Sequence, residues 1–201
     1  MISPHQESGF SLVETLVAIT ILLLVIVGPM SISSSVARST SYASEQVVAF
    51  FLAQEGAELA QKARDDLQLQ FFGVGSGDPW ADFIGKNPGD TYYHCFQPGG
   101  CGLQLIDGDA NGLLMAPINC GSNTCRLSID GSGGRARYTY SSDAGLESTP
   151  YTRVIYMSHP SGSGADDREV EITSRVSWQT GNQRQVQTVE AKTYLFNVYD
   201  N

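Results

Sequence analysis

The chain has 201 residues, of which 41% are hydrophobic and 16% are charged, and its formal net charge at pH 7 is −9. This acidic balance argues against direct binding of nucleic acid or anionic lipid through net charge. Once the apolar N-terminal stretch is set aside, the remaining length predicts one domain of ordinary size with its own core.

The N-terminal 30 residues contain a long apolar segment with a single carboxylate. From residue 10 to residue 30 the only ionisable side chain is Glu14, and residues 16–27 are apolar except for Thr20. A hydrocarbon core of roughly 30 Å needs about 20 helical residues, so this segment is long enough to span a membrane. A carboxylate in such a span is costly without a partner, which predicts either a functional partner for Glu14 or a position at the level of the lipid headgroups.

Gly9, Phe10, Ser11, Leu12, Val13 and Glu14, followed without a break by aliphatic residues, resemble the signal of type IV prepilins and type II secretion pseudopilins. The resemblance implies that a membrane prepilin peptidase cuts between Gly9 and Phe10, removing a leader of residues 1–9, and methylates the new amine of Phe10. It implies that Glu14 then faces the Phe10 ammonium of a neighbouring subunit. The expected partners are the prepilin peptidase, other pilin subunits, the filament assembly platform and the membrane.

The expected location follows from the same resemblance. It is a single pass through the cytoplasmic (inner) membrane with an extracytoplasmic C-terminal domain, and a surface or periplasmic filament after assembly. The leader departs from the family pattern, because it contains Glu7 and no Lys or Arg, and Arg38 is the nearest base beyond the span. A second processing route is signal peptidase cleavage after Ala37, where Ser35 and Ala37 are suitably small. That route would release a protein beginning at Arg38, and the alternative function is an extracytoplasmic binding protein that is either released in this way or anchored in the membrane.

A long helix is expected from the apolar segment onward. Residues 10–30 would form its membrane-spanning or filament-core part, with a break at Gly28 and Pro29 because proline removes a backbone donor and clashes with the preceding turn. Residues 31–70 would continue as an amphipathic helix with apolar positions three or four apart. These positions are Val48, Leu52, Gly56, Leu59, Ala63 and Leu67. Gly56 on this face predicts either close approach of a strand or a tolerated helix glycine.

A second, shorter stretch resembles the minor-pilin branch of the same family. It comprises Leu52-Ala53-Gln54-Glu55-Gly56 within an alanine-rich segment, followed by the pair Arg64-Asp65. The resemblance implies a minor pilin or pseudopilin rather than a major pilin.

Residues 71–134 are rich in Gly, Pro, Asn and Asp, which predicts a variable loop region with at most short strands. Its four cysteines are Cys95, Cys101, Cys120 and Cys125. An extracytoplasmic location favours disulfides. Three pairings are possible, and the shortest loops join Cys95 to Cys101 and Cys120 to Cys125. A zinc site with His94 as an extra ligand is the alternative, although the spacings are longer than those of zinc knuckles.

The segment from Asp107 to Gly112 has the sequence DGDANG, which matches the first half of a calcium-binding loop. The twelfth position, where such a loop carries a bidentate acid, is Ile118. An Asx-rich turn between two short apolar stretches explains the same residues. We therefore expect no metal site, with calcium at this turn as the alternative.

Residues 135–201 carry the clearest strand pattern. Residues 169–178 alternate, with Val170, Ile172, Val176 and Trp178 on one face. Residues 184–196 form a further expected strand, in which Val189, Ala191, Thr193 and Leu195 share a face. Strands are also expected at residues 135–140 and 151–158. The resulting prediction is an α+β fold of the pilin type, with a long N-terminal helix packed on an antiparallel sheet of about four strands.

Enzymatic motifs are absent from the sequence. His5, His94 and His159 are scattered, and no nucleophile elbow, phosphate loop or zinc-helix motif occurs. We expect a protein that is not an enzyme and that uses no cofactor.

Overall fold

The structure is a computed structural model, and it describes residues 9, 11–74, 77–106, 115–121, 125–131, 134, 136–140, 145–160, 168–179 and 185–198. The chain divides into two compact units, residues 1–44 and residues 45–201. Each unit is described by itself. The first contains the apolar half of helix α1, and the second contains the rest of α1 and all the strands.

Helix α1 comprises Leu12–Val74, and it is helical through both Gly28 and Pro29. The expected break at these two residues is therefore wrong. Proline at position 29 lacks the N–H that would bond to the carbonyl of Val25, yet the residues on both sides of it are helical. A single lost bond does not end a helix whose flanking residues, such as Leu24 and Ile32, favour or tolerate helical geometry.

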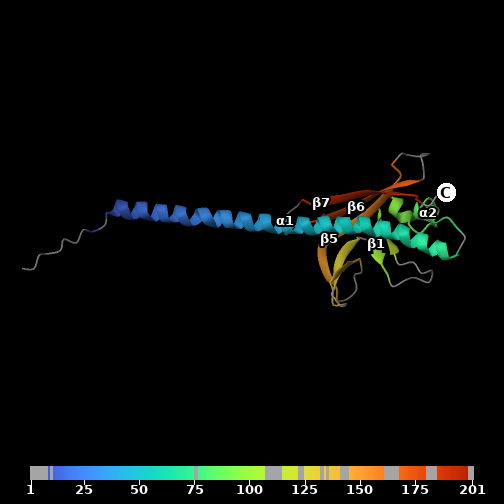
Figure 1. Cartoon of the computed structure of the whole chain (residues 1–201). Helices are drawn as coiled ribbons and strands as arrows, with labels where there is room; N and C mark the ends of the chain where they lie inside the picture. The colour runs from blue at the N-terminus through green and yellow to red at the C-terminus, as the bar shows by residue number, and fades with distance from the viewer. Residues whose placement is uncertain are drawn as a thin grey trace, which may run out of the picture. The chain divides into compact units, whose positions relative to one another are not determined.

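In the second unit, the α1 residues from position 45 onward pack along the sheet (Figure 1). The face turned to the sheet consists of fully buried alanines and two nearly buried leucines, namely Ala49, Ala53, Ala60, Ala63, Leu52 and Leu67. Small side chains let the helix backbone approach the strands closely. At Gly56, an added Cβ would lie 3.1 Å from Cβ of Ser174 and 3.1 Å from Cδ of Arg153. The prediction that a strand approaches Gly56 closely is confirmed.

The described residues form a seven-stranded antiparallel sheet. Strand β5 (Glu147–Ser158) lies at its centre and pairs with β6 (Glu169–Trp178), which pairs with β7 (Gln187–Phe196). The other edge of β5 pairs with β1 (Cys101–Leu105) and β3 (Arg126–Asp130), and these pair with β2 (Met115–Asn119) and β4 (Arg137–Thr139) respectively.

The α+β architecture is as predicted, whereas the estimate of about four strands is too low. The four expected strands are β4 to β7, and β1 to β3 come from the segment expected to be mostly loop. Each of these three added strands has only five residues. A strand of that length shows too few alternations to be distinguished from loop by its pattern.

Strands β6 and β7 alternate in burial as the sequence pattern predicts. On β6, Val170, Ile172, Val176 and Trp178 are buried, while Arg175 is exposed. The pairing of β6 with β7 is regular from Glu169 opposite Phe196 to Trp178 opposite Gln187. The sheet therefore has an inner face against α1 and an outer face toward solvent.

The segment between α1 and β1 completes the core of the second unit. Helix α2 (Pro79–Phe83) is capped by Asp78, whose side chain accepts hydrogen bonds from the backbone nitrogens of Trp80 and Ala81. The 3-10 helix η1 (Tyr93–Phe96) follows. The ring of Phe83 packs against the rings of Trp80 and Tyr92, and the distance between ring centroids is 5.6 Å in each of the two pairs. All three side chains are buried. These aromatic residues are part of the core.

Candidate functional site

The N-terminal signal residues lie at the start of α1. Gly9 is exposed and an added Cβ there would meet no atom within 4 Å, whereas Phe10 lies outside the described residues. Glu14 is exposed in the first turn of the helix. A carboxylate in that turn interacts favourably with the N-terminal end of the helix dipole. It is also close in sequence to the predicted cleavage point between Gly9 and Phe10.

The first half of α1 presents its apolar side chains outward. From Leu12 to Val36 every large aliphatic side chain for which burial is described is at least 47% exposed. This helix is long and apolar enough to cross a membrane, with a mean hydropathy of 2.5 in an 18-residue window. The hydroxyls of Thr15 and Thr20 donate to the backbone carbonyls of Leu12 and Val17, at 2.9 and 2.8 Å. These polar groups are satisfied locally, so they do not oppose transfer of the surface into an apolar environment.

The four cysteines form the two disulfides that have the shortest loops. Cys95 pairs with Cys101 and thereby joins η1 to the start of β1, and Cys120 pairs with Cys125 between β2 and β3. With all four sulfurs in disulfides, the structure does not form the alternative zinc site with His94. In the part of the chain that the structure describes, no three His, Cys, Asp or Glu side chains are grouped so as to hold a metal ion. The turn from Asp107 to Gly112 lies outside the described residues.

A buried arginine joins the second half of α1 to the sheet. The Nη1 atom of Arg153 on β5 donates to Oε2 of Glu55 at 2.7 Å and to the carbonyl of Leu52 at 3.4 Å. Its Nε donates to the hydroxyl of Tyr140 at 2.8 Å. Burial raises the pKa of Tyr140. Burial acts to lower the pKa of Arg153, but the interactions with Tyr140 and Glu55 outweigh it and raise that pKa, so the guanidinium stays charged.

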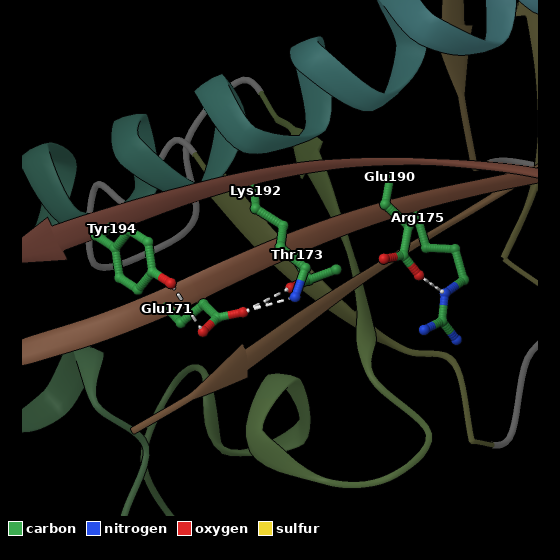
Figure 2. Close-up of polar contacts among 6 residues, drawn as sticks. All are labelled: Glu171, Thr173, Arg175, Glu190, Lys192 and Tyr194. Carbon is green, nitrogen blue, oxygen red and sulfur yellow. Dashed lines mark hydrogen bonds and ion pairs between the residues drawn. The ribbon is translucent and has the colours of Figure 1, made fainter. Parts of the chain in front are cut away.

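The outer face of β6 and β7 carries a row of cross-strand charge pairs (Figure 2). Lys192 and Tyr194 both donate to the carboxylate of Glu171, at 2.9 and 3.2 Å. Arg175 donates to Glu190 at 2.7 Å. Its guanidinium lies over the ring of Tyr156, 4.9 Å from the ring centroid. The hydrogen bond from Lys192 is the main cause that lowers the pKa of Glu171.

Sequence reasoning identified some of these residues and missed others. The solvent-facing side of β6 follows from alternation, but its partners on β7 depend on the pairing register. Arg153 was not among the predicted residues, although it lies two residues from both Tyr151 and Ile155, which are buried, and so shares the inner face of β5 with them. The structure shows in addition that the partner of its buried charge is Glu55 of α1.

A protein-family model described as the prokaryotic N-terminal methylation motif matches residues 4–28. No curated protein and no solved structure matches the chain. The matched motif is the signal of type IV prepilins and pseudopilins, and the long helix on an antiparallel sheet is the fold expected with it. The chain therefore carries the N-terminal signal of type IV prepilins and pseudopilins at residues 4–28.

Proposed function

We propose that the chain is a structural subunit, a minor pilin or pseudopilin, of a type IV pilus-like or type II secretion filament. The observation that carries the proposal is the methylation motif at residues 4–28 together with the exposed aliphatic surface of α1 from Leu12 to Val36. A surface of that kind needs lipid before assembly and neighbouring helices after it. The role is one of assembly rather than of catalysis.

Processing would create the second half of the assembly site. Cleavage after Gly9 by the prepilin peptidase produces a free amine on Phe10, which the same enzyme methylates. In an apolar filament core, this ammonium and the carboxylate of Glu14 are each costly alone and compensate each other when adjacent. Pairing between neighbouring subunits would therefore set the register of one α1 helix against the next.

The second unit would then lie on the extracytoplasmic side. Its two disulfides are stable in an oxidising compartment and rare in the cytoplasm, which supports this topology. The alanine-rich packing face of α1 near Gly56 coincides with the stretch that resembles minor pilins.

Mass spectrometry of the mature protein tests the processing step. We expect an N-terminus at Phe10 carrying one added methyl group. A mature protein that begins at Arg38 would instead support a protein released by signal peptidase, and an intact Met1 would contradict both routes.

Substitution of Glu14 tests the assembly step. We expect Glu14→Ala to leave membrane insertion unchanged and to abolish incorporation into filaments, measured by fractionation of sheared filaments from membranes. Thr20→Ala is the matched control, because its hydroxyl bonds only within the helix. Normal incorporation of Glu14→Ala would overturn the pairing with Phe10.

A further inference from the structure

Strand β7 has a free edge in the structure. Among the described residues it pairs only with β6, over ten consecutive residue pairs without a bulge. It contains no proline. Natural sheets usually protect such an edge by shortening it, twisting it or placing charges on it, because an open edge is a template for another strand.

The direction of the β7 backbone groups follows from one backbone hydrogen bond just beyond the end of the strand. The N–H of Asn197 donates to the carbonyl of Arg168 at 2.8 Å, one step beyond the pair Phe196 with Glu169. Hydrogen-bonded and non-bonded pairs alternate in an antiparallel ladder. The odd-numbered residues of β7 therefore bond to β6, and the backbone groups of the even-numbered residues point to the free edge.

The charges on β7 are directed away from this edge. Lys192 donates to Glu171, and Glu190 accepts from Arg175, so both side chains lean back over β6 (Figure 2). The edge thus keeps its backbone groups open while its charged side chains are held on the outer face.

The order of side chains along the edge is self-complementary. If two β7 strands pair antiparallel about Ala191, then Glu190 of each copy lies opposite Lys192 of the other. In the same register Thr188 lies opposite Tyr194, and Val186 lies opposite Phe196. The two apolar members, Val186 and Phe196, are 63% and 51% exposed in the single chain. Centring the pair on Lys192 or on Glu190 would instead place like charges opposite each other, which is unfavourable.

We infer that the free edge of β7 binds the β7 edge of a second copy of this chain, in an antiparallel two-fold pair centred on Ala191. The two sheets become one continuous sheet, as in other cases of strand addition. The inference does not depend on the filament proposal. The two β7 strands of this pair run in opposite directions. Because β7 belongs to the second unit, the contact joins the second units of two chains, and it is separate from helix packing between successive subunits.

Cysteine crosslinking of the full chain in excess detergent tests the register. In the inferred pair, Ala191 of each copy occupies a non-hydrogen-bonded site with Cα atoms about 4.5 Å apart, within the range that a disulfide spans. We expect Ala191→Cys to give a dimer on oxidation, with a 191–191 disulfide found by mass spectrometry. Thr193→Cys is the matched control and should give none, because residue 193 faces residue 189 of the other copy. No Ala191→Cys dimer, or equal dimer from both variants, would overturn the inference.

Charge variants test complementarity without new cysteines. Lys192→Glu leaves two acids on the edge and Glu190→Lys leaves two bases, so each variant should dimerise about tenfold more weakly than the natural chain. Mixing the two variants should restore dimers in sedimentation, because every acid then meets a base. Mixing changes no contact within either chain, so a failure to restore dimers would contradict the pairing.

Discussion

Arg153 on β5 and Glu55 on α1 form a 2.7 Å ion pair across 98 residues of sequence. The two ends of the pair differ in environment, since the arginine side chain is 2% exposed and the glutamate side chain is 45% exposed. The guanidinium is therefore held inside the interface between helix and sheet, and its carboxylate partner reaches in from the rim. This pair fixes the position of α1 along the strands of the second unit.

Removal of Glu55 should cost more stability than removal of Arg153. Glu55→Ala leaves a buried guanidinium without its carboxylate, and we expect a loss of about 2–3 kcal/mol, below the full penalty of a buried pair because water reaches the glutamate. Arg153→Met removes the charge itself and should cost about 1–2 kcal/mol. Denaturant unfolding of the full chain in detergent measures both losses.

Arg137→Ala provides the control for this comparison, because it removes the exposed member of the Arg137–Asp130 pair, which lies outside the inferred β7 contact. We expect a change within about 1 kcal/mol. A loss from Glu55→Ala no larger than that from Arg137→Ala would show that the Arg153 pair does not hold the helix to the sheet.

The close contact at Gly56 gives a second prediction. A Cβ at this position would overlap Oγ of Ser174 and crowd Cδ of Arg153, so Gly56→Ala should destabilise the protein by about 1–3 kcal/mol. Ser174 Oγ is buried and has no hydrogen-bond partner within the described part of the chain. Ser174→Ala alone should therefore be close to neutral, and the double variant should lose less than Gly56→Ala. Thermal unfolding monitored by tryptophan fluorescence measures each change.

Gly28→Ala is the matched control, since it lies in the same helix and an added Cβ there meets no atom within 4 Å. Alanine favours helix over glycine by about 1 kcal/mol. If Gly56→Ala behaved like Gly28→Ala, the approach of β6 to the helix would be looser than the structure shows.

The contacts of Gly56 and Arg153 show how much of the packing could be predicted from the sequence. Gly56 could be predicted to meet a strand because it lies on an apolar stripe of helical period, and such a stripe needs a sheet or another helix to cover it. The partner of Arg153 could not be predicted, because Glu55 is 98 residues away and only the packed fold brings the two together. The periodicity of apolar residues predicts which face of a helix or strand is buried, but it does not identify the polar group of the neighbouring element that contacts this face.

The short strands show the same limit. Strand β2 contains Pro117, which pairs opposite Leu103 of β1. Proline is tolerated on an edge strand because its missing N–H can face away from the neighbour. In the sequence alone, however, a proline in a segment of only five residues predicts a loop. Only the pairing with β1 shows that this segment is a strand. The N-terminal signal, by contrast, is a local sequence pattern, so it could be recognised from the sequence alone.

The two disulfides should contribute unequally to stability. A loop of this size predicts about 2 kcal/mol for each cross-link from chain entropy alone. Cys95 and Cys101 are fully buried, so replacing both by serine also buries two hydroxyls, whereas Cys120 is only partly buried. We expect the Cys95→Ser and Cys101→Ser double variant to lose more stability than the Cys120→Ser and Cys125→Ser double variant in denaturant unfolding. Equal losses would mean that burial of the first disulfide adds nothing to its cross-link.

The outer face of the sheet should show a defined dependence on pH. The pKa of Glu171 is lowered chiefly by the hydrogen bond from Lys192, and the pKa of Lys192 is raised chiefly by the same bond. A lowered carboxyl pKa contributes stability above its unfolded value, and this is lost as the pH falls through the folded pKa. A raised lysine pKa contributes stability below its unfolded value, and this is lost as the pH rises through the folded pKa. The pair therefore acts between these limits, around neutral pH.

Lys192→Met should move the pKa of Glu171 upward, toward its ordinary value of 4.5. Tyr194→Phe should move it in the same direction by less, because the bond from the Tyr194 hydroxyl is a smaller cause than the bond from Lys192. An NMR titration of the Glu171 side-chain carboxyl carbon measures both shifts in the full chain. Glu171 keeps its Thr173 contact in each variant, so that contact cancels in the comparison. A midpoint unchanged by Lys192→Met would show that the ion pair does not persist in solution, and β7 would then carry a free lysine on its outer face.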